Sequence, residues 1–203
     1  MEFRDVLAQR RMHRAFLPDP IPREQIERIA GVIRHAPSGG FSQGASIVAV
    51  TGEAMRRAIA ERFEAGNDWY APAGERYIAS APVHMVISAN ESLYHARYNE
   101  PDKLRGSGGV EITWPVPYWF VDAGALMMLV LMAAIAEGLA SAFIGHPEQQ
   151  EIFADLLGLP DEVVPLGLAL IGKAAPDPVA ERATSRRRER RRPTGDLIHW
   201  GRW

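Results

Sequence analysis

The chain has 203 residues, a formal net charge of −2 and no cysteine. This length fits one domain or at most two, and 47% hydrophobic with 24% charged residues excludes a wholly disordered chain. The absence of cysteine excludes disulfides, thiolate metal sites and a cysteine nucleophile. The near-neutral charge argues against a nucleic-acid binder, and residues 1–5 do not resemble a signal peptide, so we expect a cytoplasmic protein.

Arginine is distributed unevenly along the chain. It accounts for 21 of the 23 basic residues, with seven in residues 1–34, six in 35–181 and eight in 182–202. Codon bias would explain the preference for arginine over lysine, but not the clusters at both ends. Because guanidinium groups bind phosphate and carboxylate through paired hydrogen bonds, the clusters are typical of an anion site.

Hydrophobic periodicity predicts alternating helices and strands. Helices are expected over residues 2–10, from Pro22 to about residue 33, and over 53–63 and 147–157. Buried strands are expected over residues 46–51, 82–88, 140–145 and 164–172, and loop or irregular helix over 64–80. One domain of mixed α and β structure is the simplest account.

Residues 90–118 show little periodicity and contain four aromatic residues, Tyr94, Tyr98, Trp114 and Tyr118. An irregular stretch of this length is typical of a lid or binding loop, and its aromatic content disfavours disorder. We therefore expect an ordered cover over a binding site.

Residues 122–137 are apolar on every face of a helix. The run between its two acidic residues has 14 residues, whereas a membrane span needs about 20. The pattern favours a helix buried in the core or across a subunit interface, and no membrane partner is expected.

The motifs of common self-sufficient catalysts are missing. The six histidines are scattered without metal-ligand spacing, and the chain has no Gly-x-Ser-x-Gly elbow, Walker loop or Gly-x-Gly-x-x-Gly fingerprint. If the protein is an enzyme, a bound cofactor is expected to carry the chemistry, with no catalytic side chain and no metal.

Four separated segments share the order and spacing of a known family. They are Arg10-Arg11-Met12-His13-Arg14-Ala15-Phe16, Ala36-Pro37-Ser38-Gly39-Gly40-Phe41-Ser42-Gln43, Gly138-Leu139-Ala140-Ser141-Ala142-Phe143-Ile144-Gly145, and a tail from Glu189 through Arg190-Arg191-Arg192-Pro193 to His199. Taken singly, they read as a basic helix end, a loop, a strand entry and a basic tail. Together the chain resembles the nitroreductase family of FMN-dependent flavoproteins.

The resemblance implies an α+β fold with a central, mostly antiparallel sheet flanked by helices. It also implies one domain over residues 1–203 and an intertwined homodimer with flavins at the interface. In this reading residues 90–118 form the cover, and residues 173–203 are a C-terminal extension that packs on the partner subunit.

The resemblance also implies a set of site residues. Around the FMN phosphate and ring it implies Arg10, Arg11, Arg14, Arg191, Pro37, Ser38, Gly39, Gln43, Ile144 and Gly145. Trp114 and Tyr118 are the candidates for stacking on the substrate.

The implied activity is transfer of hydride from NADH or NADPH through FMN to a planar acceptor, such as a nitroaromatic or a quinone, by a ping-pong mechanism. Met12 stands where the family has serine, Phe41 where it has asparagine, and Gly44-Ala45 where a Pro-Trp pair is common. These departures leave open an FMN-binding or flavin-sequestering protein with little turnover. Reductive dehalogenation and flavin destruction, which relatives perform, also remain open.

Overall fold

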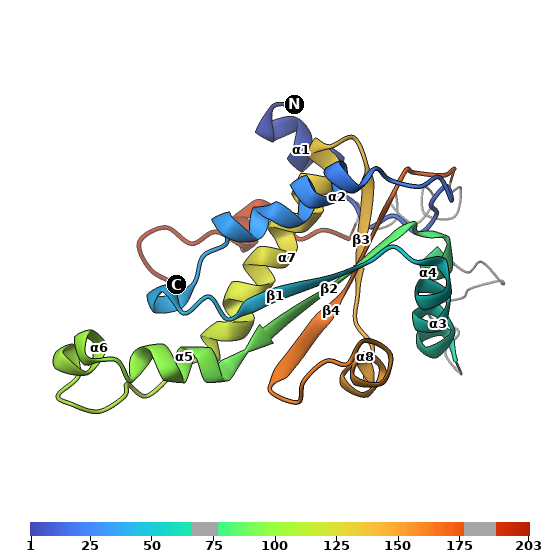
Figure 1. Ribbon diagram of the computed structural model, residues 1–203. Coiled ribbons are helices and arrows are strands. Elements are labelled where there is room, and N and C mark those ends of the chain that lie inside the picture. Colours follow the sequence, from blue (N-terminus) through green and yellow to red (C-terminus); the bar gives the residue numbers. More distant parts are fainter. Residues whose placement is uncertain (66–76, 177–189) are drawn as a thin grey trace.

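A computed structural model describes residues 1–65, 77–176 and 190–203. Its centre is a four-stranded antiparallel sheet in the order β1-β2-β4-β3 (Figure 1). The strands are β1 (Ala45–Val50), β2 (Val83–Asn90), β3 (Ala140–Ile144) and β4 (Val163–Gly172). All four predicted strands are confirmed, and their antiparallel pairing with helices on both faces makes the fold α+β, as the resemblance implies.

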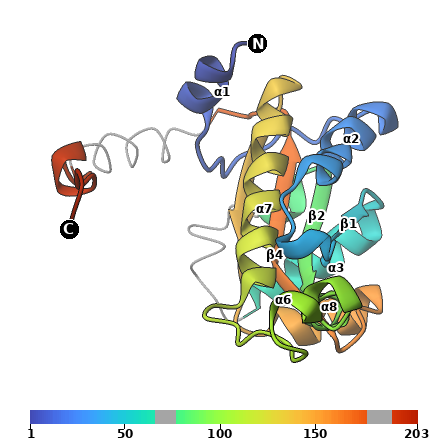
Figure 2. The same cartoon turned by 90° about the vertical axis from the view of Figure 1, so that its left-hand side faces the viewer.

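The long helix α7 (Tyr118–Ala136) lies across one face of the sheet, with α1 (Phe3–Gln9) and α2 (Arg23–Ala30) beside it (Figures 1 and 2). Alternate residues of β2, Val83, Met85 and Ile87, pack in one buried cluster with Leu126 and Val130 of α7. This alternation is what period-two patterning on a strand produces.

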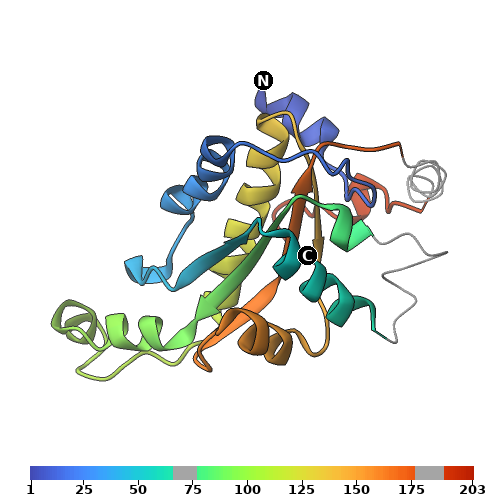
Figure 3. The ribbon, with the colours of Figure 1, turned by 45° about the vertical axis from the view of Figure 1, so that its right-hand side comes forward.

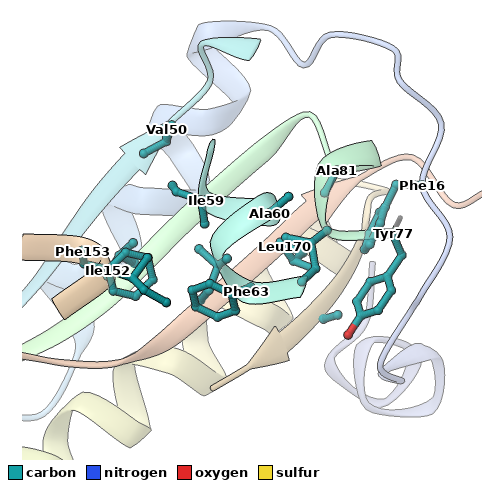
Figure 4. Packing of buried hydrophobic residues seen from close by; sticks show 14 of the residues in the cluster. Phe16, Val50, Ile59, Ala60, Phe63, Tyr77, Ala81, Ile152, Phe153 and Leu170 are labelled. Atoms are coloured by element: carbon teal, nitrogen blue, oxygen red, sulfur yellow. The ribbon is translucent and has the colours of Figure 1, made fainter. Parts of the chain in front are cut away.

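The opposite face carries α3 (Glu53–Glu64), α4 (Tyr77–Ser80) and α8 (Gln149–Leu157), as Figure 3 shows. Phe63 of α3 and Phe153 of α8 are fully buried with ring centroids 5.6 Å apart, close to Leu170 of β4 (Figure 4). The sheet is therefore covered on both faces, which leaves its strand ends and edges available for a site.

By length and composition alone, α7 could cross a membrane. However, eight of its 19 residues are buried within the protein, and one of them is the carboxyl-bearing Asp122. Its remaining face is also apolar and stays only partly buried or exposed, at Val121, Gly124, Ala125, Met128 and Met132. These residues follow the i, i+3, i+4, i+7, i+11 spacing of one helix face, so they form one apolar stripe along the helix.

The expectation that residues 90–118 lack regular structure is wrong for their first half. Helix α5 (Glu91–Tyr98) begins where Asn90 Oδ1 accepts a hydrogen bond from Ser92 N at 3.0 Å, and α6 (Pro101–Gly106) begins with a proline. Figure 1 shows both helices projecting beyond the end of the sheet. Because little of their surface packs on the core, they carry no apolar stripe that sequence periodicity could detect.

The last described segment, residues 190–203, contains a short 3-10 turn, η4 (Thr194–Asp196), and is exposed throughout. Figure 2 shows it lying away from the sheet. Part of the predicted irregular region 64–80 and part of the tail motif fall in residues 66–76 and 177–189, outside the described residues.

Candidate functional site

The loop at residues 36–44, called here the glycine loop, joins the 3-10 helix η1 (Gly31–His35) to β1 and contains a second one, η2 (Gly39–Phe41). Gly40, Phe41 and Gln43 all have positive φ angles, of 61°, 65° and 53°. Phenylalanine and glutamine rarely adopt this conformation, which persists only where surrounding contacts enforce it.

Several hydrogen bonds enforce the conformation of the glycine loop. Gln43 N donates to Ser38 Oγ at 2.6 Å, and Asn90 N donates to Gly44 O at 2.7 Å. The Gly39 N–H donates to Asp122 Oδ2 at 2.8 Å. The loop is thus attached to β2 and to α7, and its backbone is held before any ligand arrives.

Asp122 connects this loop to α5 as well. Its Oδ2 also accepts a hydrogen bond from the Tyr94 hydroxyl at 2.7 Å, and both residues are buried. Burial, followed by the hydrogen bond to Asp122, raises the pKa of Tyr94 above its ordinary value. Sequence reasoning placed Tyr94 in the expected aromatic cover but missed Asp122 as a part of the site. The available signal was a single acid in an otherwise apolar helix.

Gly44 is required by the position of the Tyr94 ring. A Cβ atom at residue 44 would lie 2.5 Å from Tyr94 Cε2 and 2.7 Å from Asn90 O. This explains why glycine stands where the family commonly has a larger residue: the Tyr94 ring fills the space that a side chain would need.

Five aromatic residues form a continuous group next to the glycine loop, called here the aromatic cover: Tyr94, Tyr98, Trp114, Tyr118 and Trp119. The Trp114 ring lies 4.5 Å from Tyr98 and 6.1 Å from Tyr118, centroid to centroid. The Tyr98 ring in turn lies against the loop, 2.6 Å from where a Cβ at Gly40 would stand. The structure therefore brings the two predicted substrate residues, Trp114 and Tyr118, close to the loop predicted to contact the flavin ring.

A carboxylate and histidine network holds Trp114 in place. Glu111 Oε1 accepts from Trp114 Nε1 at 2.7 Å and lies 2.5 Å from His95 Nδ1, while Glu111 Oε2 accepts from Asn99 at 2.8 Å. Glu91 lies 3.1 Å from the other ring nitrogen of His95. The hydrogen bonds to Glu111 and then Glu91 raise the pKa of His95, and those from Trp114 and then His95 lower the pKa of Glu111.

Residues 10–14, called here the arginine segment, follow α1 and lie along one end of the sheet. His13 N donates to Ser141 O at 3.1 Å, and Arg11 Nε donates to His13 Nε2 at 3.2 Å. Arg10 and Arg14 are partly buried, and neither has a carboxylate partner among the described residues. Two guanidinium groups without counterions are suited to hold an anion such as a phosphate.

Within this chain, the arginine segment and the glycine loop lie at opposite ends of the sheet. The arginine segment is beside Ser141, which is in register, through β4, with Val83 at the start of β2. The glycine loop contacts Asn90 at the far end of β2. At about 3.3 Å per residue, this strand separates them by about 20 Å. A single copy of the chain therefore does not bring the predicted phosphate and ring contacts together.

The remaining predicted site residues lie at the end of β3, at the start of the glycine loop and in the segment 190–203. Ile144 ends β3 and pairs with Leu168, and Gly145 follows it at the surface. Ile144 O can approach β4 closely because residue 167 is glycine, where a Cβ would lie 2.5 Å from that oxygen. Pro37 is exposed at the start of the glycine loop, and Arg191 is exposed in the segment 190–203.

Comparison with known proteins matches residues 7–173 to the model of the nitroreductase family. The FMN reductase [NAD(P)H] of Bacillus subtilis is 28% identical over 173 residues, which is 83% of this chain but less than two thirds, 64%, of that protein. The 5,6-dimethylbenzimidazole synthase of Rhodobacter capsulatus is 30% identical, covering 77% of this chain and 76% of that protein. A protein from Exiguobacterium sibiricum, solved in complex with FMN, superposes with a TM-score of 0.71 at 18% identity, over 98% of this chain and 97% of that one. The chain belongs to the nitroreductase family.

Proposed function

We propose that the protein is an FMN-dependent oxidoreductase that uses NADH or NADPH to reduce a planar organic acceptor such as a nitroaromatic or a quinone. Bound FMN would supply the redox chemistry, taking hydride from the nicotinamide and passing it to the acceptor in a ping-pong cycle. The proposal is carried by Arg10 and Arg14, which have no carboxylate partner among the described residues, together with a glycine loop that lies under aromatic rings.

The arginine segment fits the phosphate of FMN. Arg10 and Arg14 have no competing carboxylate in the described part of the chain, and their partial burial strengthens a charged hydrogen bond relative to a fully solvated one. Arg11 lies alongside with its Nε engaged by His13, so it is the weaker candidate. Arg191 of the tail would join them from the segment that follows residue 189.

A homodimer would join the two halves of the site. The apolar stripe of α7, including Val121, Met128 and Met132, is only partly buried in one subunit and is suited to a twofold interface. A twofold axis near α7 could set the arginine segment of one subunit against the glycine loop of its partner. In this arrangement the extension 173–203 packs on the partner, as intertwining requires.

The glycine loop would contact the flavin ring through Pro37, Ser38, Gly39 and Gln43, and Ile144-Gly145 would contribute backbone. The Gly39 N–H is already donated to Asp122, so this residue would contact the ring by packing and not by that hydrogen bond. Trp114 and Tyr118 would stack on a planar acceptor. The chain's own tasks are thus to bind, orient and shield, which agrees with the absence of a catalytic acid–base motif.

Two alternatives have specific support. The exposed Phe41 and the partly buried Met12 stand where the family has polar residues, and they favour a flavin-sequestering protein with little turnover. The 30% identity to a 5,6-dimethylbenzimidazole synthase favours production of that compound, whose dimethylbenzene ring is also present in FMN.

The alternatives are separated by adding NADH or NADPH to FMN-loaded protein under anaerobic conditions, followed by a quinone. The proposal expects the flavin absorbance to bleach and then to return. A loaded protein that neither nucleotide bleaches would contradict the oxidoreductase and support sequestration. Mass-spectrometric detection of 5,6-dimethylbenzimidazole after aeration of the reduced protein would support the second alternative.

The phosphate assignment is tested with Arg14→Ala, using Arg23→Ala as the matched control. Arg23 is an exposed arginine whose ion-pair partner in the described residues is Glu27 on its own helix. Arg14→Ala is expected to raise the Kd for FMN by about tenfold or more, because a charged hydrogen bond contributes about 1.5–3 kcal/mol. The control should bind as the unchanged protein does. Equal affinity in both variants would refute the assignment.

A further inference from the structure

Asp122 is the only carboxylic acid within α7, and its side chain is buried at 7% exposure. In the described chain it forms no ion pair with a lysine, arginine or histidine. Placing a carboxyl group among apolar residues is unfavourable unless its oxygens accept hydrogen bonds. The packing of α7 against the sheet does not by itself explain why a carboxyl group is buried at this position.

Both donors to Asp122 belong to the candidate site. The Oδ2 atom of Asp122 accepts two hydrogen bonds, one from Gly39 N at 2.8 Å and one from the Tyr94 hydroxyl at 2.7 Å. Gly39 is in the glycine loop, and Tyr94 is the fully buried member of the aromatic cover, with rings of Trp114 and Trp119 each 6.1 Å away. The carboxyl group is thus a junction between two elements that lie 83 and 28 residues from it in the sequence.

The strained conformation of the glycine loop depends on its hydrogen bond to Asp122. Residues 40, 41 and 43 have positive φ angles, two of them without the freedom of glycine, so the loop stores backbone strain. The bond to Gly39 N lies immediately before this strained stretch. Without it, the loop would relax away from the cover and lose the surface on which a flat ring could rest.

We propose that Asp122 is a positioning residue that fixes the glycine loop and the aromatic cover relative to one another, and so sets the spacing between the cofactor ring and a stacked acceptor. This inference rests on the proposed function. This role requires no contact between Asp122 and either ligand, because its Oδ2 acts through the loop and the cover.

Three substitutions separate this role from simple packing. Asp122→Leu removes both hydrogen bonds, and Tyr94→Phe removes only the one to the cover. Asp122→Asn keeps a carbonyl oxygen that can accept both hydrogen bonds, so this variant should retain FMN binding and turnover. Glu137→Gln is the matched control, because Glu137 lies at the other end of α7, where it pairs with Arg28 at 2.7 Å.

The measurements are the Kd for FMN, by quenching of its fluorescence, and kcat and KM for a quinone acceptor. Asp122→Leu is expected to raise the FMN Kd by about fivefold, the effect of losing the bond to Gly39, and the acceptor KM by about fivefold, the effect of losing the bond to Tyr94. Tyr94→Phe should raise the acceptor KM by about fivefold, the effect of one bond, with little change in kcat or in the FMN Kd. Asp122→Asn and Glu137→Gln should stay close to the unchanged protein in all three quantities.

Hydrogen exchange on the flavin-free protein gives a readout that does not depend on the proposed function. Asp122→Leu should speed amide exchange in residues 36–44 and in α5 together, whereas Glu137→Gln should not. If the unchanged protein binds no FMN, the proposed function fails, but coupled exchange would still support the junction. If Asp122→Leu binds FMN normally and leaves exchange in both segments unchanged, the junction is refuted. If Asp122→Leu does not fold, Tyr94→Phe tests the junction instead. An unchanged acceptor KM together with unchanged amide exchange in α5 would then refute the junction.

Discussion

Replacing Gly44 by alanine should separate Tyr94 from Asp122. The new Cβ would start 2.5 Å from Tyr94 Cε2 and 2.7 Å from Asn90 O, whereas ordinary contacts begin near 3.4 Å. The oxygen belongs to the backbone at the end of β2, so the Tyr94 ring must give way by about 0.9 Å. That shift would lengthen the bond from its hydroxyl to Asp122, now 2.7 Å, beyond hydrogen-bonding distance.

The expected loss combines overpacking, about 1–3 kcal/mol, with one buried hydrogen bond, about 1 kcal/mol. For a chain of this size, a loss of about 3 kcal/mol lowers Tm by about 6–12 °C. The measurement is thermal unfolding of the flavin-free protein, with Gly31→Ala as the control, since a Cβ at Gly31 meets nothing within 4 Å. A Gly44→Ala variant with the Tm of the unchanged protein would refute the packing described here.

Three further predictions follow from the fold and the proposed dimer. Phe41→Asn should raise Tm by about 2–4 °C, because asparagine tolerates a φ of 65° better than phenylalanine, and an unchanged Tm would mean that the loop is not strained there. Burial lowers the pKa of His84 to about 4, so below pH 6.5 the unfolded chain binds a proton that the folded chain does not. The free energy of unfolding should therefore fall by about 3 kcal/mol as the pH drops from about 6.5 to about 4, and denaturant titrations of His84→Gln should lack that slope. Met132→Lys places a charge in the apolar stripe of α7 and should yield a monomer by sedimentation that no longer retains FMN; a dimer of normal affinity would contradict the proposed interface.

Much of the fold could be predicted because its core elements carry strong periodic patterns. The strands are short apolar runs, and α7 is apolar all round, so both were identified from the sequence. The helices α5 and α6 were missed because they are held by local polar contacts, such as Arg97 to Asp102 at 2.7 Å, and project from the sheet. Such contacts leave no hydrophobic period to detect.

The sequence motifs of the site could be predicted, but the contacts that bring distant segments together could not. The arginine segment and the glycine loop were found as short patterns, yet the contacts that fix the loop come from Asp122 and Tyr94, far away in the chain. Local spacing contains no information about such a junction. Nor could it indicate that one subunit holds the two motifs at opposite ends of its sheet, which is a property of strand order and register.

The visible spectrum of the purified protein, recorded after incubation with FMN and removal of the excess, tests the central claim most directly. We expect the absorbance bands of oxidised flavin to stay with the protein and to bleach when NADH or NADPH is added. A protein that remains colourless after this treatment would contradict the flavin site that the arginine segment and the glycine loop are proposed to form.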